Sequence, residues 1–194
     1  MTKRIAIIQG HPDASESQLC HALADTYGAG AENAGFQVRS IRVAELGFPL
    51  IRSRRDFEQG ERPACIQEAQ EVIRESRHLL LVYPLWLGTM PALLKGFLEQ
   101  VFRYDFAFEP KPDGRYEKKL KGRSARVVIT MGMPALAYRW YFRAHSLKSL
   151  ERNILKFAGI APVRETLFGM VENADPRKCA RWLEKMRTLG AAGR

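Results

Sequence analysis

The chain has little cysteine, and its cysteines are not arranged as a site. Its 194 residues include three, Cys20, Cys65 and Cys179, which lie far apart and form no CxxC pair. This spacing matches no common zinc or iron–sulfur signature, and an odd count argues against a disulfide framework. We therefore expect reduced thiols, no metal site and a reducing compartment, the cytoplasm.

Long hydrophobic runs are also missing. The longest uncharged run, from Leu79 to Leu94, contains two prolines and a glycine. It is shorter than the ~20 residues that a membrane-spanning helix needs. The amino-terminal sequence has no signal-peptide hydrophobic core or cleavage site. We expect a cytoplasmic protein with no stable membrane insertion.

Two common phosphate signatures, GxGxxG and the Walker A motif, are absent, and so is any long run of Lys and Arg. The net charge is nevertheless +10, from 31 basic and 21 acidic residues. A basic surface can attract nucleic acid, an anionic membrane, or anionic ligands such as NADPH and flavin phosphates. Because no helix carries a basic stripe interleaved with aromatic residues, we do not expect nucleic-acid binding.

Apolar strands and amphipathic helices alternate along the whole chain, which predicts a single domain over residues 1–194. Apolar segments predict five strands, at about 5–8, 38–43, 79–82, 125–129 and 163–171. Where the apolar run is continuous, as at 5–8 and 79–82, we expect the strand to be buried on both faces. Thr89 is expected to cap one helix, and Asp175 with Pro176 to begin the last. We expect residues 45–61 to be an irregular connection and 105–123 to be a long loop or hairpin.

Five strands separated by helices predict an α/β fold, a parallel sheet with helices on both faces. Because the first strand stands at the very start of the sequence, the flavodoxin-like strand order 2-1-3-4-5 is the natural choice. In that order a ligand binds at the switch point between strands one and three, beyond their carboxyl ends. The loops after strands one, three and four should therefore carry the chemistry.

The loop after strand one, residues 10–18, leads into the amino terminus of a helix, where free amides favour an anion. Ser15, Ser17 and Gln18 can add side-chain donors to a phosphate there, beside His11. The alternative is that a serine only caps the helix and that His11 is a solvated loop residue.

The loops after strands three and four contain unusual residues for connectors. Residues 83–88 include two leucines, a proline, a glycine and a tryptophan. Of these we expect Pro84, Leu85, Trp86 and Leu87 to contact a ligand. A flavin ring needs such an apolar wall together with backbone amide donors. Thr130 and Gly132 follow strand four, and Gly132 lets the backbone approach a ligand closely. Farther along the chain, Tyr138 is a candidate hydrogen-bond donor and His145 a candidate general acid. Each of these residues also has a structural alternative. Trp86 can simply pack in the core, and Tyr138 and His145 can have structural roles.

The segment from Tyr83 to Phe102 resembles the signature of the flavodoxin-like NAD(P)H:quinone oxidoreductases. That group includes the DT-diaphorase type, bacterial drug-activity modulators, and flavoproteins ancillary to potassium efflux systems. Residues 10–13 (GHPD), 106–108 (FAF) and 130–132 (TMG) match in the same order, so the similarity covers nearly the whole chain.

The resemblance implies a flavin, FMN or alternatively FAD, held without a covalent bond at a homodimer interface. It implies NAD(P)H as co-substrate and two-electron hydride transfer, by a ping-pong mechanism, to a quinone or similar small-molecule acceptor. It places Tyr138 over the ring, and His145 falls one residue from the family histidine. Flavin contacts are expected from nine residues: His11, Ser17, Gln18, Pro84, Leu85, Trp86, Leu87, Thr130 and Gly132.

Two departures from the family stand out. Leu87 and Gly88 follow Trp86 where relatives often have two consecutive aromatic residues, which opens the pocket on that side, and Glu16 stands beside the expected phosphate site. Two alternatives to an enzyme stay open: a regulatory flavoprotein ancillary to a membrane transporter, and a basic nucleic-acid binder without a cofactor.

Overall fold

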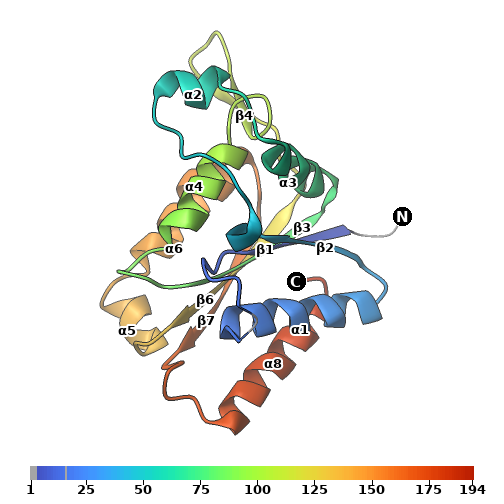
Figure 1. The fold of residues 1–194 in the computed structure, drawn as a ribbon, viewed down its shortest axis with the longest axis vertical. Coiled ribbons are helices and arrows are strands. Elements are labelled where there is room, and N and C mark those ends of the chain that lie inside the picture. Colours follow the sequence, from blue (N-terminus) through green and yellow to red (C-terminus); the bar gives the residue numbers. More distant parts are fainter. Residues whose placement is uncertain (1–3, 16) are drawn as a thin grey trace.

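The computed structural model describes residues 4–15 and 17–194, and its centre is one parallel sheet (Figure 1). The strand order is β2-β1-β3-β6-β7. The strands are β1 (Arg4–Gln9), β2 (Gln37–Arg42), β3 (His78–Pro84), β6 (Ser124–Met131) and β7 (Val163–Gly169). The strands β4 (Phe108–Pro110) and β5 (Tyr116–Lys118) lie outside this sheet and form a small antiparallel hairpin. The flavodoxin-like order predicted from the sequence is therefore confirmed.

Helices cover both faces of the sheet (Figure 1). One face packs against α1 (Leu19–Asn33) and α8 (Pro176–Ala191). The other packs against α3 (Ala64–Glu75), α4 (Ala92–Val101), α6 (His145–Ser149), the π-helical segment η2 (Leu150–Leu155) and α7 (Lys156–Ala158). Smaller elements complete the chain: the 3₁₀ turn η1 (Val43–Glu45), α2 (Arg54–Gln59) and α5 (Ala135–Trp140).

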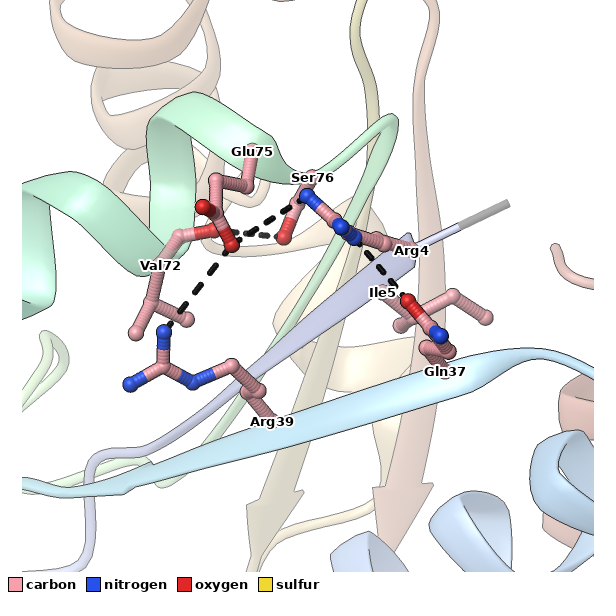
Figure 2. A pocket seen from close by; sticks show the side chains of 7 residues that line it. All are labelled: Arg4, Ile5, Gln37, Arg39, Val72, Glu75 and Ser76. Atoms are coloured by element: carbon pink, nitrogen blue, oxygen red, sulfur yellow. Dashed lines mark hydrogen bonds and ion pairs between the residues drawn. The ribbon is translucent and has the colours of Figure 1, made fainter. Parts of the chain in front are cut away.

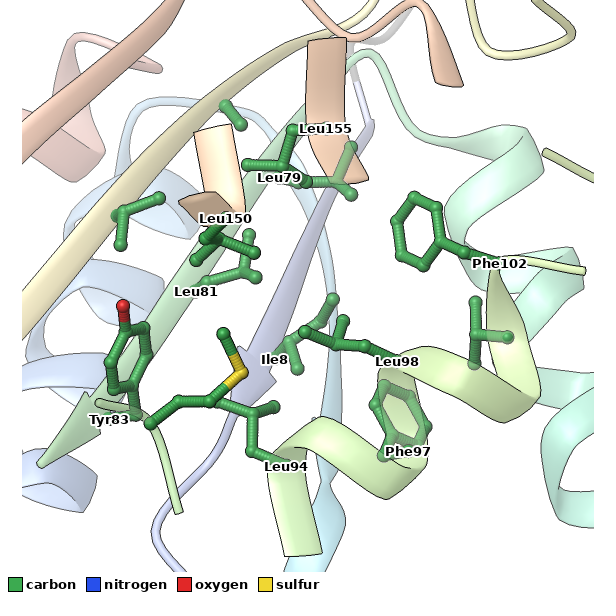
Figure 3. Close-up of a cluster of buried hydrophobic side chains, with 14 of the residues drawn as sticks. Ile8, Leu79, Leu81, Tyr83, Leu94, Phe97, Leu98, Phe102, Leu150 and Leu155 are labelled. Carbon is green, nitrogen blue, oxygen red and sulfur yellow. The ribbon is translucent and has the colours of Figure 1, made fainter. Parts of the chain in front are cut away.

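Alternation along the strands divides the core into two clusters. Ile5 and Ile7 pack under α1 and α8, whereas Ala6 and Ile8 pack on the opposite face. Figure 3 shows the larger cluster, where Leu81 lies among side chains from α4 and η2. Every residue of β3 is buried, as its continuous apolar run predicted.

Two local predictions were wrong. Thr89 does not cap a helix: it closes a turn with Trp86, and α4 begins only after Pro91, whose fixed φ suits the position before a first helical turn. The stretch 45–61 is not wholly irregular, because Ser53 accepts a hydrogen bond from the Asp56 amide (3.0 Å) and so begins α2. The other predicted cap is confirmed, since the Asp175 carboxylate accepts from the Lys178 amide at 2.7 Å.

In the part of the chain that the structure describes, no helix is long and apolar enough to cross a membrane.

Candidate functional site

Three loops meet at the carboxyl edge of the sheet. Backbone hydrogen bonds join them: the Gly10 amide donates to Val82 O at 2.7 Å, and the Leu85 amide donates to Thr130 O at 2.8 Å. The ends of β1, β3 and β6 are thus held side by side, as parallel pairing requires. The residues predicted on these loops do form one region.

His11 and Trp86 form a wall between the first two loops. Their ring centroids are 5.9 Å apart and their planes make an angle of 78°. His11 Nδ1 lies 3.1 Å from the Asp13 amide nitrogen and 3.3 Å from the Asp13 carbonyl oxygen, so it accepts from the amide in one tautomer and donates to the carbonyl in the other. Burial lowers the pKa of His11, which favours the neutral ring. With its proton on Nε2, His11 offers one N–H donor next to the exposed indole.

The buried side chain of His21, which sequence reasoning missed, anchors the first loop. The Gln9 amide donates to the Asp25 carboxylate at 2.8 Å, which turns its carbonyl oxygen toward His21 Nδ1, 2.5 Å away. The other ring nitrogen of His21 lies 2.8 Å from the carbonyl oxygen of Asp13. His21 thus ties the loop backbone to the end of β1. The only sequence signal was a polar residue, Gln9, at the end of an apolar run.

The Asp13 carboxylate gathers the donors that we expected at a phosphate. It accepts from the Ser15 amide, from Ser15 Oγ and from Gln18 Nε2, each at 2.9 Å. Ser17 Oγ lies 3.4 Å from Ser15 Oγ, within the same group. These hydrogen bonds lower the pKa of Asp13. The donors that we expected at a phosphate therefore bond to a side-chain anion in this structure; Glu16 lies outside the described residues.

The loop after β3 presents an exposed apolar surface. Leu87 is fully exposed and has a positive φ of 46°, as does Gly88 at 79°. The amide of Leu85 is bonded to Thr130 O, and the amides of Trp86 and Thr89 each bond to the other's carbonyl (2.9 Å). Donors for a ring must therefore come from residues other than Leu85 and Trp86, which offer carbon surface. Pro84 is buried as the last residue of β3.

The end of β6 lies close to the start of α1. Thr130 is buried, and its Oγ1 lies 3.2 Å from Cys20 Sγ. Burial raises the pKa of the Cys20 thiol to about 11, so the thiol is inert. Gly132 is exposed, and a Cβ built there would lie 3.1 Å from a Glu172 carboxylate oxygen, so a side chain at this position would crowd the loop.

Tyr138 and His145 are placed differently from each other. Tyr138 is buried, and its hydroxyl lies 2.7 Å from Ser146 Oγ and accepts from the Leu147 amide at 3.1 Å. His145 is exposed, and its Nδ1 lies 2.9 Å from the carbonyl oxygen of Phe142. No contact among the described residues joins either ring to His11 or Trp86. Sequence reasoning did not single out Ser146, the residue that the Tyr138 hydroxyl contacts.

A groove of about 440 Å³ runs from the Trp86 loop toward α6. It is mostly apolar, and its lining includes the polar side chains of Lys95 and Ser146. Its lining residues are Trp86, Leu87, Thr89, Met90, Pro91, Ala92, Lys95, Ser146, Ser149, Leu150 and Ile154. The groove therefore joins the exposed indole to the hydroxyl that holds Tyr138.

A second cavity, of about 310 Å³, lies at the opposite edge of the sheet (Figure 2). Arg4 and Arg39 both reach Glu75 there, at 3.4 and 4.0 Å. None of the residues that we predicted for the site lines it, and its charges are largely paired. Among the described residues, no group of His, Cys, Asp and Glu side chains is arranged to hold a metal ion.

Comparison with known proteins agrees with this fold. Residues 3–189 match the Flavodoxin_2 family, described by its flavodoxin-like fold. A Haemophilus influenzae protein named as an uncharacterized NAD(P)H oxidoreductase is 28% identical over 175 residues, which cover 88% of this chain and 86% of that protein. Mouse ribosyldihydronicotinamide dehydrogenase [quinone] is 29% identical over 172 residues, covering 79% and 73%.

A solved structure with the same fold contains a flavin. It is an FMN-dependent NADH-azoreductase from Bacillus anthracis in complex with FMN, with a TM-score of 0.77. The two chains are 16% identical, and the match covers 98% of this chain and 99% of that one.

Proposed function

This chain belongs to the Flavodoxin_2 family, and on that premise we propose that it is an NAD(P)H-dependent flavin oxidoreductase of the quinone or azo reductase type. The observation that carries the proposal is the wall of His11 and Trp86, with ring centroids 5.9 Å apart, at the switch point between β1 and β3. Open α/β sheets bind flat cofactors at that point.

FMN suits the donor set better than FAD. The group around Asp13 offers Ser15, Ser17 and Gln18 to one phosphate at the start of α1, and the FMN-bound azoreductase shares the fold. Trp86 and Leu87 would cover the ring with carbon, and His11 Nε2 would donate to a polar edge. A bound flavin would supply the chemistry, taking a hydride from NAD(P)H and passing it to a quinone-like acceptor in a ping-pong sequence.

We propose that Tyr138 serves the acceptor through Ser146. The Tyr138 hydroxyl is buried, and Ser146, whose Oγ lies 2.7 Å from it, is one of the residues that line the groove together with Trp86. Ser146 can therefore pass a proton between Tyr138 and an acceptor oxygen. His145 lies outside the groove, and a role as general acid requires segment 142–146 to turn toward the acceptor.

A homodimer is part of the proposal. Large apolar side chains lie exposed on and after α5 and in the Trp86 loop: Leu136, Trp140, Tyr141, Phe142, Trp86 and Leu87. Such a concentration is unusual for a monomer's surface and supports burial against a second copy. Trp140→Glu should shift the protein toward monomer in sedimentation experiments, whereas Leu50→Glu, a change at another exposed apolar residue, should not.

The test begins with flavin binding. Purified protein incubated with FMN should acquire flavin absorbance, and it should then oxidise NADPH with a benzoquinone as acceptor. Protein that takes up neither FMN nor FAD would rule out the proposal. Bound flavin with negligible turnover would instead favour the regulatory alternative.

The residue roles need a separate measurement, the rate at which a quinone reoxidises the reduced protein. Ser146→Ala and Tyr138→Phe should slow this half-reaction while leaving reduction by NADPH unchanged; His145→Ala tests the general acid. Unchanged reoxidation in all three variants would sink the assignment without touching the flavin site.

A further inference from the structure

A group of buried polar side chains lies far from the flavin site, at the amino ends of the strands. Tyr27 on α1, His78 on β3 and Arg126 on β6 are exposed by 0%, 6% and 7%. In the strand register His78 pairs with Ser124, and Arg126 pairs with Arg164. Alternation puts them on the same face as Leu80 and Val128, which pack under α1 and α8.

One polar atom on each of the three side chains has no partner. Within the described residues, Tyr27 OH, His78 Nε2 and Arg126 Nε are buried without a hydrogen bond. Two neighbouring atoms do have partners: His78 Nδ1 lies 2.8 Å from Ser124 Oγ, and Arg126 Nη1 donates to Thr166 Oγ1 at 2.8 Å and to Glu165 O at 3.3 Å. If Ser124 donates to Nδ1, the His78 proton is on Nε2, and all three orphaned atoms are donors. What the group lacks is an acceptor.

Positive charges outnumber negative ones around the group. Arg164 and Arg194 lie close enough to Arg126 to lower its pKa further, after the larger effect of burial. Glu165, the acidic neighbour with an opposite effect, directs its carboxylate to Arg139 (2.6 Å). None of the ion pairs formed by the described residues includes Arg126 or Arg164. A buried guanidinium without a counter-ion is costly, and an anion removes that cost better than a neutral water does.

We propose that Tyr27, His78 and Arg126 form a binding site for a small inorganic anion, a halide or a single oxyanion. The three donors would converge on it, and Arg126 would supply the neutralising charge. The ligand must be small, because α1 and α8 close this face of the sheet. The site is independent of the flavin proposal, since it lies at the opposite edge of the sheet.

Such a site would link stability to the anion present. A ligand that binds only the folded state stabilises it by RT ln(1 + [L]/Kd). The melting temperature should therefore stay flat while chloride is below its Kd and then rise linearly with the logarithm of the chloride concentration as chloride replaces gluconate at constant ionic strength, because gluconate is too large to enter. Bromide, nitrate and phosphate in the same series distinguish a halide site from an oxyanion site.

Tyr27→Phe provides the sharpest variant. In gluconate it should be at least as stable as the parent, because it removes a buried hydroxyl that has no partner. In chloride the parent should gain more, and the variant's apparent affinity should be weaker by about tenfold, the effect of one hydrogen bond to an ion. Arg126→Met should lose the anion dependence entirely. Arg39→Met, a change at an exposed arginine on the other face, should retain it.

A crystal grown in sodium bromide gives the direct readout. An anomalous peak bounded by Tyr27 OH, His78 Nε2 and Arg126 Nε is the expected result. Ordered water at that position, or an anion response that Tyr27→Phe leaves unchanged, would overturn the proposal.

Discussion

The carboxylate of Asp13 accepts a hydrogen bond from the side-chain amide of Gln18, with 2.9 Å between Oδ2 and Nε2. The same carboxylate takes both donors of Ser15. A phosphate bound at these donors must therefore share them with the Asp13 carboxylate or displace it. Because both groups are negatively charged, they would repel each other at a separation of a few ångströms.

Asp13→Asn should strengthen FMN binding. The amide keeps an acceptor oxygen for Ser15 but removes the charge, and relief of the repulsion should lower the Kd for FMN by about fivefold. Quenching of flavin fluorescence measures the affinity. Riboflavin, which has no phosphate, is the control and should bind both proteins equally. Weaker FMN binding by the variant would mean that Asp13 mainly shapes the loop.

Trp86→Ala should weaken binding of FMN and riboflavin alike. The indole is half exposed beside His11, so a flavin ring would contact a surface that is already in place. Loss of an aromatic contact of this size should raise the Kd about tenfold, and Trp86→Phe should recover part of that loss. Tyr116→Ala, at a similarly exposed aromatic residue on the β4–β5 hairpin, is the matched control. If alanine at 86 left both affinities unchanged, the ring site would lie elsewhere.

Tyr138→Phe should lower the free energy of unfolding by about 1–3 kcal/mol, because it leaves the Leu147 amide and Ser146 Oγ buried without this partner. His145→Ala should change it by less than about 0.5 kcal/mol, since that side chain is exposed. Urea unfolding of both variants measures the difference. Equal stabilities would show that the Tyr138 hydroxyl is not held as described.

The fold could be predicted because the sheet's signals are local. The apolar runs of β1 and β3 are continuous since both faces are buried, and β6 departs from this pattern within residues 125–129 only at Arg126. Thr89 is a residue for which local signals were not enough. It is a good capping residue, but α4 begins after Pro91, whose ring fixes φ there. The start of this helix depended on which of two residues in the same turn became the cap.

The candidate site could be predicted only in part. Strand order alone brings His11 next to Trp86, so that contact followed from topology. The links from His21 to Gln9 and from Tyr138 to Ser146 depend on side-chain directions across separate elements or turns, which no spacing rule supplies. The hydrogen bonds of Asp13 could not be predicted for the same reason. Its carboxylate accepts from Ser15 and Gln18, which we had expected to bind a ligand.

Stability should fall as the pH falls from about 6.5 to 4, because of His78. Burial, then the charges of Arg126 and Arg164, lower its pKa to about 4 from the 6.5 of an ordinary histidine. Between those values the unfolded chain binds a proton that the folded chain does not, so acid favours unfolding. The stabilisation is present above pH 6.5 and should decrease by about 3 kcal/mol on going down to pH 4. Urea unfolding in a gluconate buffer at several pH values, with parent and His78→Asn compared, measures this slope. His78→Asn should show a flatter dependence, whereas His145→Asn should keep the parent's slope; equal slopes in parent and His78→Asn would show that His78 is not the group responsible.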